Sequence, residues 1–252
     1  MWKPKFSFFK SKPLLPKLSP RQLGVTLILV SLILGGLYLF LKDLPSPAKL
    51  ARPLAFPVSS KILDRNGVLL YEIYADQNRT PIKIDELPKY VTQATIAIED
   101  KNFYTHNGFD TGGILRALYK TLTGQRLEGG STITQQLVKV TLLTPERTIS
   151  RKIKEAILTI ATEVLYTKDQ ILEMYVNHIP YGGTTYGIEA ASKRYFDKSA
   201  KELTLAEASL LAGLPQAPSR FSPWSAPDAA KSRQAQVISR MQEEGFISSE
   251  DA

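Results

Sequence analysis

Two adjacent acidic residues, Glu99 and Asp100, end an apolar stretch and stand next to Phe103, Tyr104 and His106. A carboxylate at the C-terminal end of a helix opposes the helix dipole, so the position is unfavourable unless something else requires it. An acid beside aromatic residues can have its pKa raised towards that of a useful general base. These residue types in this order therefore indicate proton-transfer chemistry.

The two histidines of the chain, His106 and His178, give a weaker signal. For His106 the favoured interpretation is a hydrogen-bonded structural histidine rather than a catalytic one. The two histidines are far apart in the sequence and lack the spacing of metal ligands, so we predict no metal site.

A second candidate is the stretch GGSTITQQLVK, residues 129–139. Thr132 and Gln135 fit a capping box, which predicts a helix that begins directly after the glycines. The free N–H groups at the start of a helix suit a phosphate group, and the glycines let a substrate approach the backbone. The Gly-Lys-Ser/Thr of a Walker loop is absent. Taken alone, the stretch is interpreted as an ordinary capped surface helix.

The next predicted helix, residues 148–166, carries further charged candidates. Its buried stripe is expected to consist of Ile149, Ile153, Ile157, Ile160 and Val164. Helical geometry then places Glu155 nearly opposite the stripe, with Lys152 on the same flank as Glu155. Isolated charges of this kind usually form a solvated surface. However, Lys139, Arg147 and Lys152 fall within two consecutive helices and their junction, and together they could clamp a pyrophosphate.

The charge of the chain is concentrated at its start. The chain has 252 residues and a net charge of +8, and residues 1–22 contain six basic residues and no acid. These six account for all but +2 of the net charge, so the remaining chain is nearly neutral. A nearly neutral body without a recognisable RNA- or DNA-binding motif argues against a nucleic-acid partner.

The uncharged stretch 23–41 comes directly after this basic tail. Its length matches the hydrocarbon core of a bilayer, at about 30 Å, which predicts a transmembrane helix. A cleavable signal peptide is the competing interpretation, but its apolar region would be shorter and no clear small-x-small cleavage site is present after it. The positive-inside rule leaves residues 1–22 in the cytoplasm and exports the chain beyond residue 42. Because the chain has no cysteine, it indicates nothing about the redox environment.

The exported part is predicted to be one mainly α domain with a small β portion at its start, residues 58–252. Residues 42–57 are Pro-rich and read as a linker. Asn66-Gly67 between two apolar runs predicts a β-hairpin. Beyond Pro88 the pattern is helical, with helices expected at residues 88–100, 112–124, 132–140, 148–166, 204–213 and 227–244.

Four motifs occur in an order that resembles a known family: EDKNFYTHNGFD, GGSTITQQLVK, RKIKE and KDQILEMYVN. They resemble the successive motifs of the peptidoglycan glycosyltransferases (family 51), which are lysozyme-like polymerases found in class A penicillin-binding proteins and monofunctional transglycosylases. The resemblance covers residues 58 to 250. It implies a lysozyme-like fold for this domain.

The resemblance also implies a role for each candidate residue. Glu99 matches the family's catalytic base, and Glu155 matches its second essential acid, on the donor side. Contacts to the phosphates or to other parts of the substrate are implied for Ser131, Gln136, Lys139, Arg147, Lys152 and Asn177. A divalent cation, Mg²⁺ or Mn²⁺, is left open as an aid to the leaving group.

Family enzymes join the 4-hydroxyl of lipid II to the anomeric carbon of a glycan strand carried on undecaprenyl pyrophosphate. An α-linked donor becomes a β-1,4 linkage, so one in-line displacement with inversion is implied. Such a reaction needs a base at the hydroxyl and cations at the departing pyrophosphate. The implied partners are lipid II, the nascent glycan strand and the bacterial cytoplasmic membrane, and other cell-wall synthesis proteins remain open.

The chain departs from the family pattern at two positions. Val140 stands where asparagine is usual, and Asp197 replaces a usual glycine. Neither change removes a charged catalytic group, so they bear on local geometry rather than on activity.

Two other functions remain as alternatives. A lysozyme-like lytic enzyme would need an acid that protonates a glycosidic oxygen, and it has no use for a pyrophosphate clamp. A non-catalytic membrane scaffold of the same fold would not need Glu99 and Glu155, which are both present.

The sequence also bears on a second activity, peptide cross-linking. Ser-x-x-Lys occurs at residues 7–10 and 46–49, but no Lys-Thr-Gly exists, so both are interpreted as chance matches. The stretch LDRNGVLLYE nevertheless resembles the bifunctional enzymes. We therefore expect the chain to be the N-terminal part of a class A penicillin-binding protein whose second domain lies beyond Ala252.

Overall fold

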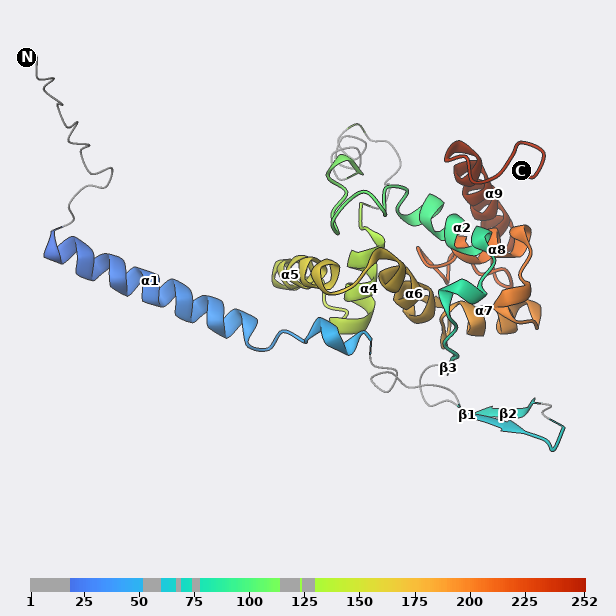
Figure 1. Cartoon of the computed structure of the whole chain (residues 1–252), viewed down its shortest axis with the longest axis horizontal. Helices are drawn as coiled ribbons and strands as arrows, with labels where there is room; N and C mark the ends of the chain where they lie inside the picture. The colour runs from blue at the N-terminus through green and yellow to red at the C-terminus, as the bar shows by residue number, and fades with distance from the viewer. Residues whose placement is uncertain (1–18, 52–59, 67–68, 74–77, 114–122, 124–129) are drawn as a thin grey trace, which may run out of the picture. The chain divides into compact units, whose positions relative to one another are not determined.

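The computed structural model describes residues 19–51, 60–66, 69–73, 78–113, 123 and 130–252 (Figure 1). The chain separates into two units, Met1–Leu44 and Pro45–Ala252, and each is described by itself. The helix predicted at residues 112–124 lies largely outside the described residues.

The first unit contains one long helix, α1 (Pro20–Leu41). Ser19 begins it with a capping box, because its hydroxyl accepts the N–H of Gln22 and the Gln22 side chain accepts the N–H of Ser19. By length and composition α1 is able to cross a membrane. It begins three residues earlier than the uncharged stretch, because Ser19 and Pro20 supply the start signal.

The β structure of the second unit is small. Strands β1 (Ser60–Leu63) and β2 (Leu69–Ile73) pair antiparallel, and the Asp64 carboxylate accepts the N–H of Asn66 at 2.8 Å in the turn. This confirms the predicted hairpin. Three short strands form a second sheet in the order β3-β5-β4: β3 (Asn78–Arg79), β4 (Pro180–Gly182) and β5 (Thr185–Tyr186).

Helices make up most of the second unit. The α-helices are α2 (Lys89–Glu99), α4 (Ile133–Leu142), α5 (Ile149–Leu165), α6 (Lys168–His178), α7 (Ile188–Phe196), α8 (Leu205–Gly213) and α9 (Pro227–Glu243). Three short 3-10 helices accompany them: η1 (Pro47–Lys49), η3 (Ile84–Glu86) and η4 (Ala200–Glu202). The mainly α fold with a small β portion is confirmed.

The helices pack in two groups. α2 packs against α8 and α9, and this contact is built largely from small residues, Ala94, Ala97 and Ala212, together with Val237 and Met241. α4 packs against α5 and α6. In Figure 1, α5 and α9 lie on opposite sides of the helical part of this unit. The end of α2 and the start of α4 therefore lie where the two groups meet.

The two departures from the family pattern have local explanations. Val140 is partly buried and packs against the main core, where an apolar side chain is suitable. Asp197 ends α7 in the left-handed conformation, with φ of 55°. Aspartate is one of the few residues besides glycine that adopts this conformation readily, so it can take the place of glycine at the end of the helix.

The buried face predicted for α5 is wrong. Ile149 and Val164 are 82% and 80% exposed, and Ile153 and Ile160 are about half exposed. The opposite face is buried instead, and it contains Glu155, Leu158, Thr159 and Thr162.

Local hydrogen bonds explain why this polar face can be buried. The hydroxyls of Thr159 and Thr162 donate to the carbonyls of Glu155 and Leu158, each at 2.7 Å. Glu155 itself has two cationic partners. A buried polar group costs little when its hydrogen bonds are made, so periodicity identified the two faces of α5 but not which one turns inward.

A pair of alanine substitutions tests this orientation. Leu158→Ala should lower the free energy of unfolding by about 2–5 kcal/mol, because the side chain is 3% exposed and its removal leaves a cavity. Ile160→Ala should cost less than about 1 kcal/mol, because that side chain is half exposed. Urea unfolding in detergent measures both values, and equal costs would contradict the orientation of α5.

Candidate active site

Glu99 is the last residue of α2 and lines a cleft of about 1170 Å³. The end of α2 and the segment before α4 form one side of the cleft, including Ser131. Residues 216–221 and α9 form the other. The cleft therefore lies between the junction of α2 with α4 and the start of α9 with the segment before it.

The two oxygens of the Glu99 carboxylate differ. Gln136 Nε2 donates to Oε2 at 2.6 Å, whereas Oε1 is buried and has no hydrogen-bond partner among the described residues. Tyr175, which is fully buried, donates its hydroxyl to Gln136 Oε1 at 3.2 Å. Because the amide oxygen of Gln136 accepts this hydrogen bond, the amide nitrogen is the atom that faces Glu99. Proton-accepting capacity is thus left at Oε1.

The surroundings of Glu99 raise its pKa. Burial is the largest cause, and the neighbouring charge of Asp100 acts in the same direction. The hydrogen bond from Gln136 and the charges of Arg233 and Lys139 oppose it. A carboxylate with a raised pKa is a stronger base than one in water, as general-base catalysis requires.

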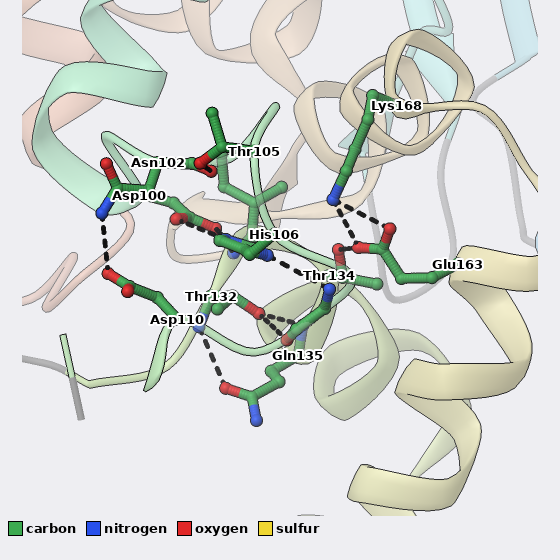
Figure 2. Close-up of polar contacts among 12 residues, drawn as sticks. Asp100, Asn102, Thr105, His106, Asp110, Thr132, Thr134, Gln135, Glu163 and Lys168 are labelled. Carbon is green, nitrogen blue, oxygen red and sulfur yellow. Dashed lines mark hydrogen bonds and ion pairs between the residues drawn. The ribbon is translucent and has the colours of Figure 1, made fainter. Parts of the chain in front are cut away.

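The adjacent Asp100 has a structural role (Figure 2). Its carboxylate accepts the N–H of Ile133, the first residue of α4, at 3.0 Å. The same carboxylate accepts the Nε2–H of His106 at 2.9 Å. His106 Nδ1 accepts the N–H of Gly108, so the ring proton that reaches Asp100 is on Nε2. His106 is therefore the hydrogen-bonded histidine that the sequence favours, and Asp100 fixes the end of α2 to the start of α4.

Figure 2 shows that further polar contacts fix the same region. Thr132 donates to the carbonyl of Gly108 at 2.8 Å and begins α4 with the predicted capping box. Thr134 donates to Glu163 of α5 at 2.5 Å, and Lys168 of α6 forms an ion pair with the same carboxylate. The loop after α2 is thus tied to α4, and α4 is tied to its two neighbouring helices.

Glu155 lies on the buried face of α5 and is 1% exposed. Arg151 Nη1 donates to its Oε2 at 2.8 Å, and Lys152 forms an ion pair with its Oε1. The predicted proximity of Lys152 and Glu155 is confirmed. Arg151 was not predicted, although it stands one turn before Glu155 and i,i+4 spacing could have indicated it.

The structure gathers the predicted residues only in part. Of the eight, Glu99 and Ser131 line the cleft among the residues that the structure describes. Gln136 lies behind Glu99. Lys139 and Arg147 are exposed on α4 and before α5. Asn177 exchanges hydrogen bonds with the backbone of Ile82 at 2.8 and 2.9 Å, which fastens α6 to the segment before η3. Substrate contacts by these residues stay predictions.

Sequence reasoning did not find two residues that act on Glu99. Tyr175 is 76 positions away and orients Gln136. Arg233, on α9, lines the cleft and contributes to the electrostatics of Glu99. Their separation in the sequence gave no signal. For a metal ion, no suitable group of three His, Cys, Asp or Glu side chains is present among the described residues, and the absence of a metal site stays a prediction.

Comparison with known proteins identifies the class to which this fold and site belong. A family model described as Transglycosylase matches residues 66–242, which is well over half of the chain. The chain belongs to the transglycosylase family, which supports glycosyl transfer as its type of reaction.

The similar proteins include penicillin-binding protein 1F of Bacillus subtilis, with 46% identity over 80% of this chain and 28% of that protein. Penicillin-binding protein 1A of Rickettsia bellii is 44% identical over 86% of this chain and 28% of that protein. Penicillin-binding protein 1A of Escherichia coli is 44% identical over 84% of this chain and 25% of that protein. These matches confirm the resemblance to class A penicillin-binding proteins, and the chain spans between a quarter and a third of their length.

Gly108 allows a stability test of the loop below the site. Its φ is +86°, and a Cβ there would lie 2.7 Å from the methyl group of buried Thr159. Gly245 has a similar φ of +72° but open space around it. Gly108→Ala should therefore cost at least about 2 kcal/mol of unfolding free energy, and Gly245→Ala only about 1 kcal/mol. Denaturant unfolding measures the difference; equal losses would contradict the close approach of Gly108 to α5.

The hydrogen bond from Gln136 predicts a shift in the pH profile of glycosyl transfer. Glu99 must be ionised to act as a base, so the rate falls as the pH drops through its pKa. Gln136→Met removes a donor that favours the ionised form, so the pKa of Glu99 should rise and the acidic limb should move to higher pH. Gln93→Met, on α2 but outside the cleft lining, is the control. An unchanged limb in Gln136→Met would mean that Glu99 does not set it.

Proposed function

We propose that this chain is a membrane-anchored peptidoglycan glycosyltransferase that polymerises lipid II into β-1,4 glycan strands, with inversion and release of undecaprenyl pyrophosphate. The observation that carries the proposal is the environment of Glu99. Glu99 lines the cleft, burial raises the pKa of its carboxyl group, and one of its oxygens remains without a donor among the described residues. Family membership supports glycosyl transfer as the reaction type.

In the proposed reaction Glu99 takes the proton of the acceptor's 4-hydroxyl at Oε1. The hydroxyl oxygen attacks the anomeric carbon of the donor as the bond from that carbon to the pyrophosphate oxygen breaks. The electron pair of this bond leaves with the pyrophosphate, and the α linkage becomes a β linkage. Gln136 stabilises the carboxylate before the transfer and holds its orientation during it.

The donor side would contain the cations near Glu155. Two cationic side chains, Arg151 and Lys152, contact this single buried carboxylate, so the three groups together carry a net positive charge. Lys139 and Arg147 are exposed on neighbouring segments and available to an anionic group. Such cations lower the barrier by stabilising the charge that develops on a departing pyrophosphate. Glu155 would act by holding Arg151 and Lys152 in position.

The exposed apolar stripe of α5 supports a substrate that resides in a membrane. Residues 42–46 separate α1 from η1, and a fully extended link of this length spans about 20 Å. η1 packs on α5, where Tyr166 donates to the Pro47 carbonyl at 3.2 Å and Leu50 is buried. An exposed apolar stripe next to the cations of α5 suits a lipid-linked substrate.

The wider assignments belong to the same proposal. Residues 1–22 form a cytoplasmic tail and residues 23–41 cross the membrane. Residues 42–57 form a linker, and residues 58–252 form the catalytic domain on the outer face of the membrane. Within that linker, η1 is already packed on the domain. A second domain after Ala252, a divalent cation at the leaving group and cell-wall synthesis partners are compatible with this arrangement.

Polymerisation of lipid II by the purified chain tests the function. The parent should make long glycan, and Glu99→Gln and Glu155→Gln should each lower the rate about 100-fold or more, because each removes a charge that the reaction needs. Glu250→Gln, which removes an exposed carboxylate outside the cleft lining, is the matched control. Full activity of Glu99→Gln would refute the proposed base. Shortening of preformed glycan by the parent would instead indicate the lytic alternative.

A further inference from the structure

The wall of the cleft opposite Glu99 contains two arginines that share one aromatic ring. The guanidinium carbon of Arg220 lies 5.5 Å from the centre of the Phe221 ring, and that of Arg233 lies 5.6 Å from it. All three residues line the cleft. Arg220 is exposed and Arg233 is half-buried.

Arg233 is held in position by its surroundings. Its Nε donates to the carbonyl of Gly213 at 3.4 Å, and its Nη1 donates to Gln236 at 3.2 Å. A Cβ on Gly213 would lie 2.8 Å from Arg233 Cγ, so glycine leaves the room that this side chain occupies. A guanidinium that is already oriented loses less entropy when it binds an anion than a freely rotating one.

Two further cations of the cleft form ion pairs. Lys101 forms an ion pair with Glu244, and Arg240 forms one with Glu243. The first pair joins the segment after α2 to the end of α9, and the second lies within α9. Arg220 is instead held by stacking on a ring, which leaves its planar donors directed to solvent or to a ligand.

The position of the cleft indicates which part of the substrate it takes. Lys139, Arg147 and Lys152, proposed for the pyrophosphate, do not line it among the described residues. α5 and α9 lie on opposite sides of the helical part of the unit (Figure 1). The α9 wall of the cleft therefore lies on the side away from the cations of α5. The substrate portion beside α9 is then the sugar chain with its peptide side arms, and those arms end in carboxylates.

We propose that Arg220 and Arg233 form a subsite for the carboxylates of the peptide arms carried by the glycan or by its lipid-linked precursor. The subsite rests on the proposed function, which supplies the sugar at Glu99. Guanidinium groups bind carboxylates through paired hydrogen bonds. The same carboxylates are repelled by the acidic side of the cleft, which contains Glu99, Asp100 and Asp110. The peptide arm therefore lies towards α9, and the 4-hydroxyl of the acceptor lies towards Glu99.

Steady-state kinetics with two substrates test the subsite in the full chain. The substrates are lipid II with its natural peptide and lipid II whose peptide carboxylates are amidated. Arg220→Gln and Arg233→Gln should each raise KM for natural lipid II about threefold to tenfold, with kcat within about twofold. Lys231→Gln, which removes an exposed charge of α9 outside the cleft lining, should leave KM unchanged. With amidated lipid II, the KM of the parent should rise to about the value that the arginine variants show with natural lipid II. The arginine variants should have nearly the same KM as the parent on this amidated substrate.

The outcomes separate the subsite from the function. A parent that makes no glycan overturns the proposed function itself. A fully active parent whose KM is unaffected by either arginine variant overturns the subsite alone. An equal rise in KM on natural and amidated lipid II also overturns it, because the arginines would then bind another group, such as the pyrophosphate. Arg220→Gln keeps the test valid if Arg233→Gln fails to fold, because Arg220 is exposed.

Discussion

The structure of the site depends on the carboxylate of Asp100. It accepts the first N–H of α4 and the Nε2–H of His106, so the end of one helix, the loop after it and the start of another are fixed together. A negative charge is favourable at the N-terminus of a helix, and this gain at α4 offsets its unfavourable place after α2. Glu99 is one residue away, so its position relative to Gln136 on α4 is set by the same contact.

Two adjacent acids thereby acquire different roles. Burial raises the pKa of both, but Asp100 has its hydrogen bonds satisfied by a ring N–H and a backbone N–H, whereas Glu99 has one committed oxygen. A satisfied carboxylate is a structural element, and a partly satisfied one retains the capacity to accept a proton. Tyr175 extends this arrangement, because it sets the orientation of the Gln136 amide from the interior of α6.

The helix α5 has a buried charged group on one face and exposed apolar side chains on the other. Its inner face holds Glu155 between Arg151 and Lys152, and its threonines satisfy their hydroxyls within the helix. Its outer face is then free to be apolar. The proposed substrate combines a lipid with a pyrophosphate, and a single amphipathic helix offers a suitable surface for each.

The amino-acid sequence was sufficient to predict the mainly α fold, the hairpin, the long apolar helix, the capping box at Thr132 and the pairing of Lys152 with Glu155. All of these depend on neighbours within a few positions, where spacing fixes geometry. It did not determine which face of α5 is buried, because periodicity does not say where the core lies. Two features are visible only in the folded chain: Tyr175 orients Gln136, and Arg220 and Arg233 line the same cleft as Glu99. Those contacts join residues from separate helices, and packing of the whole chain is what brings them within reach.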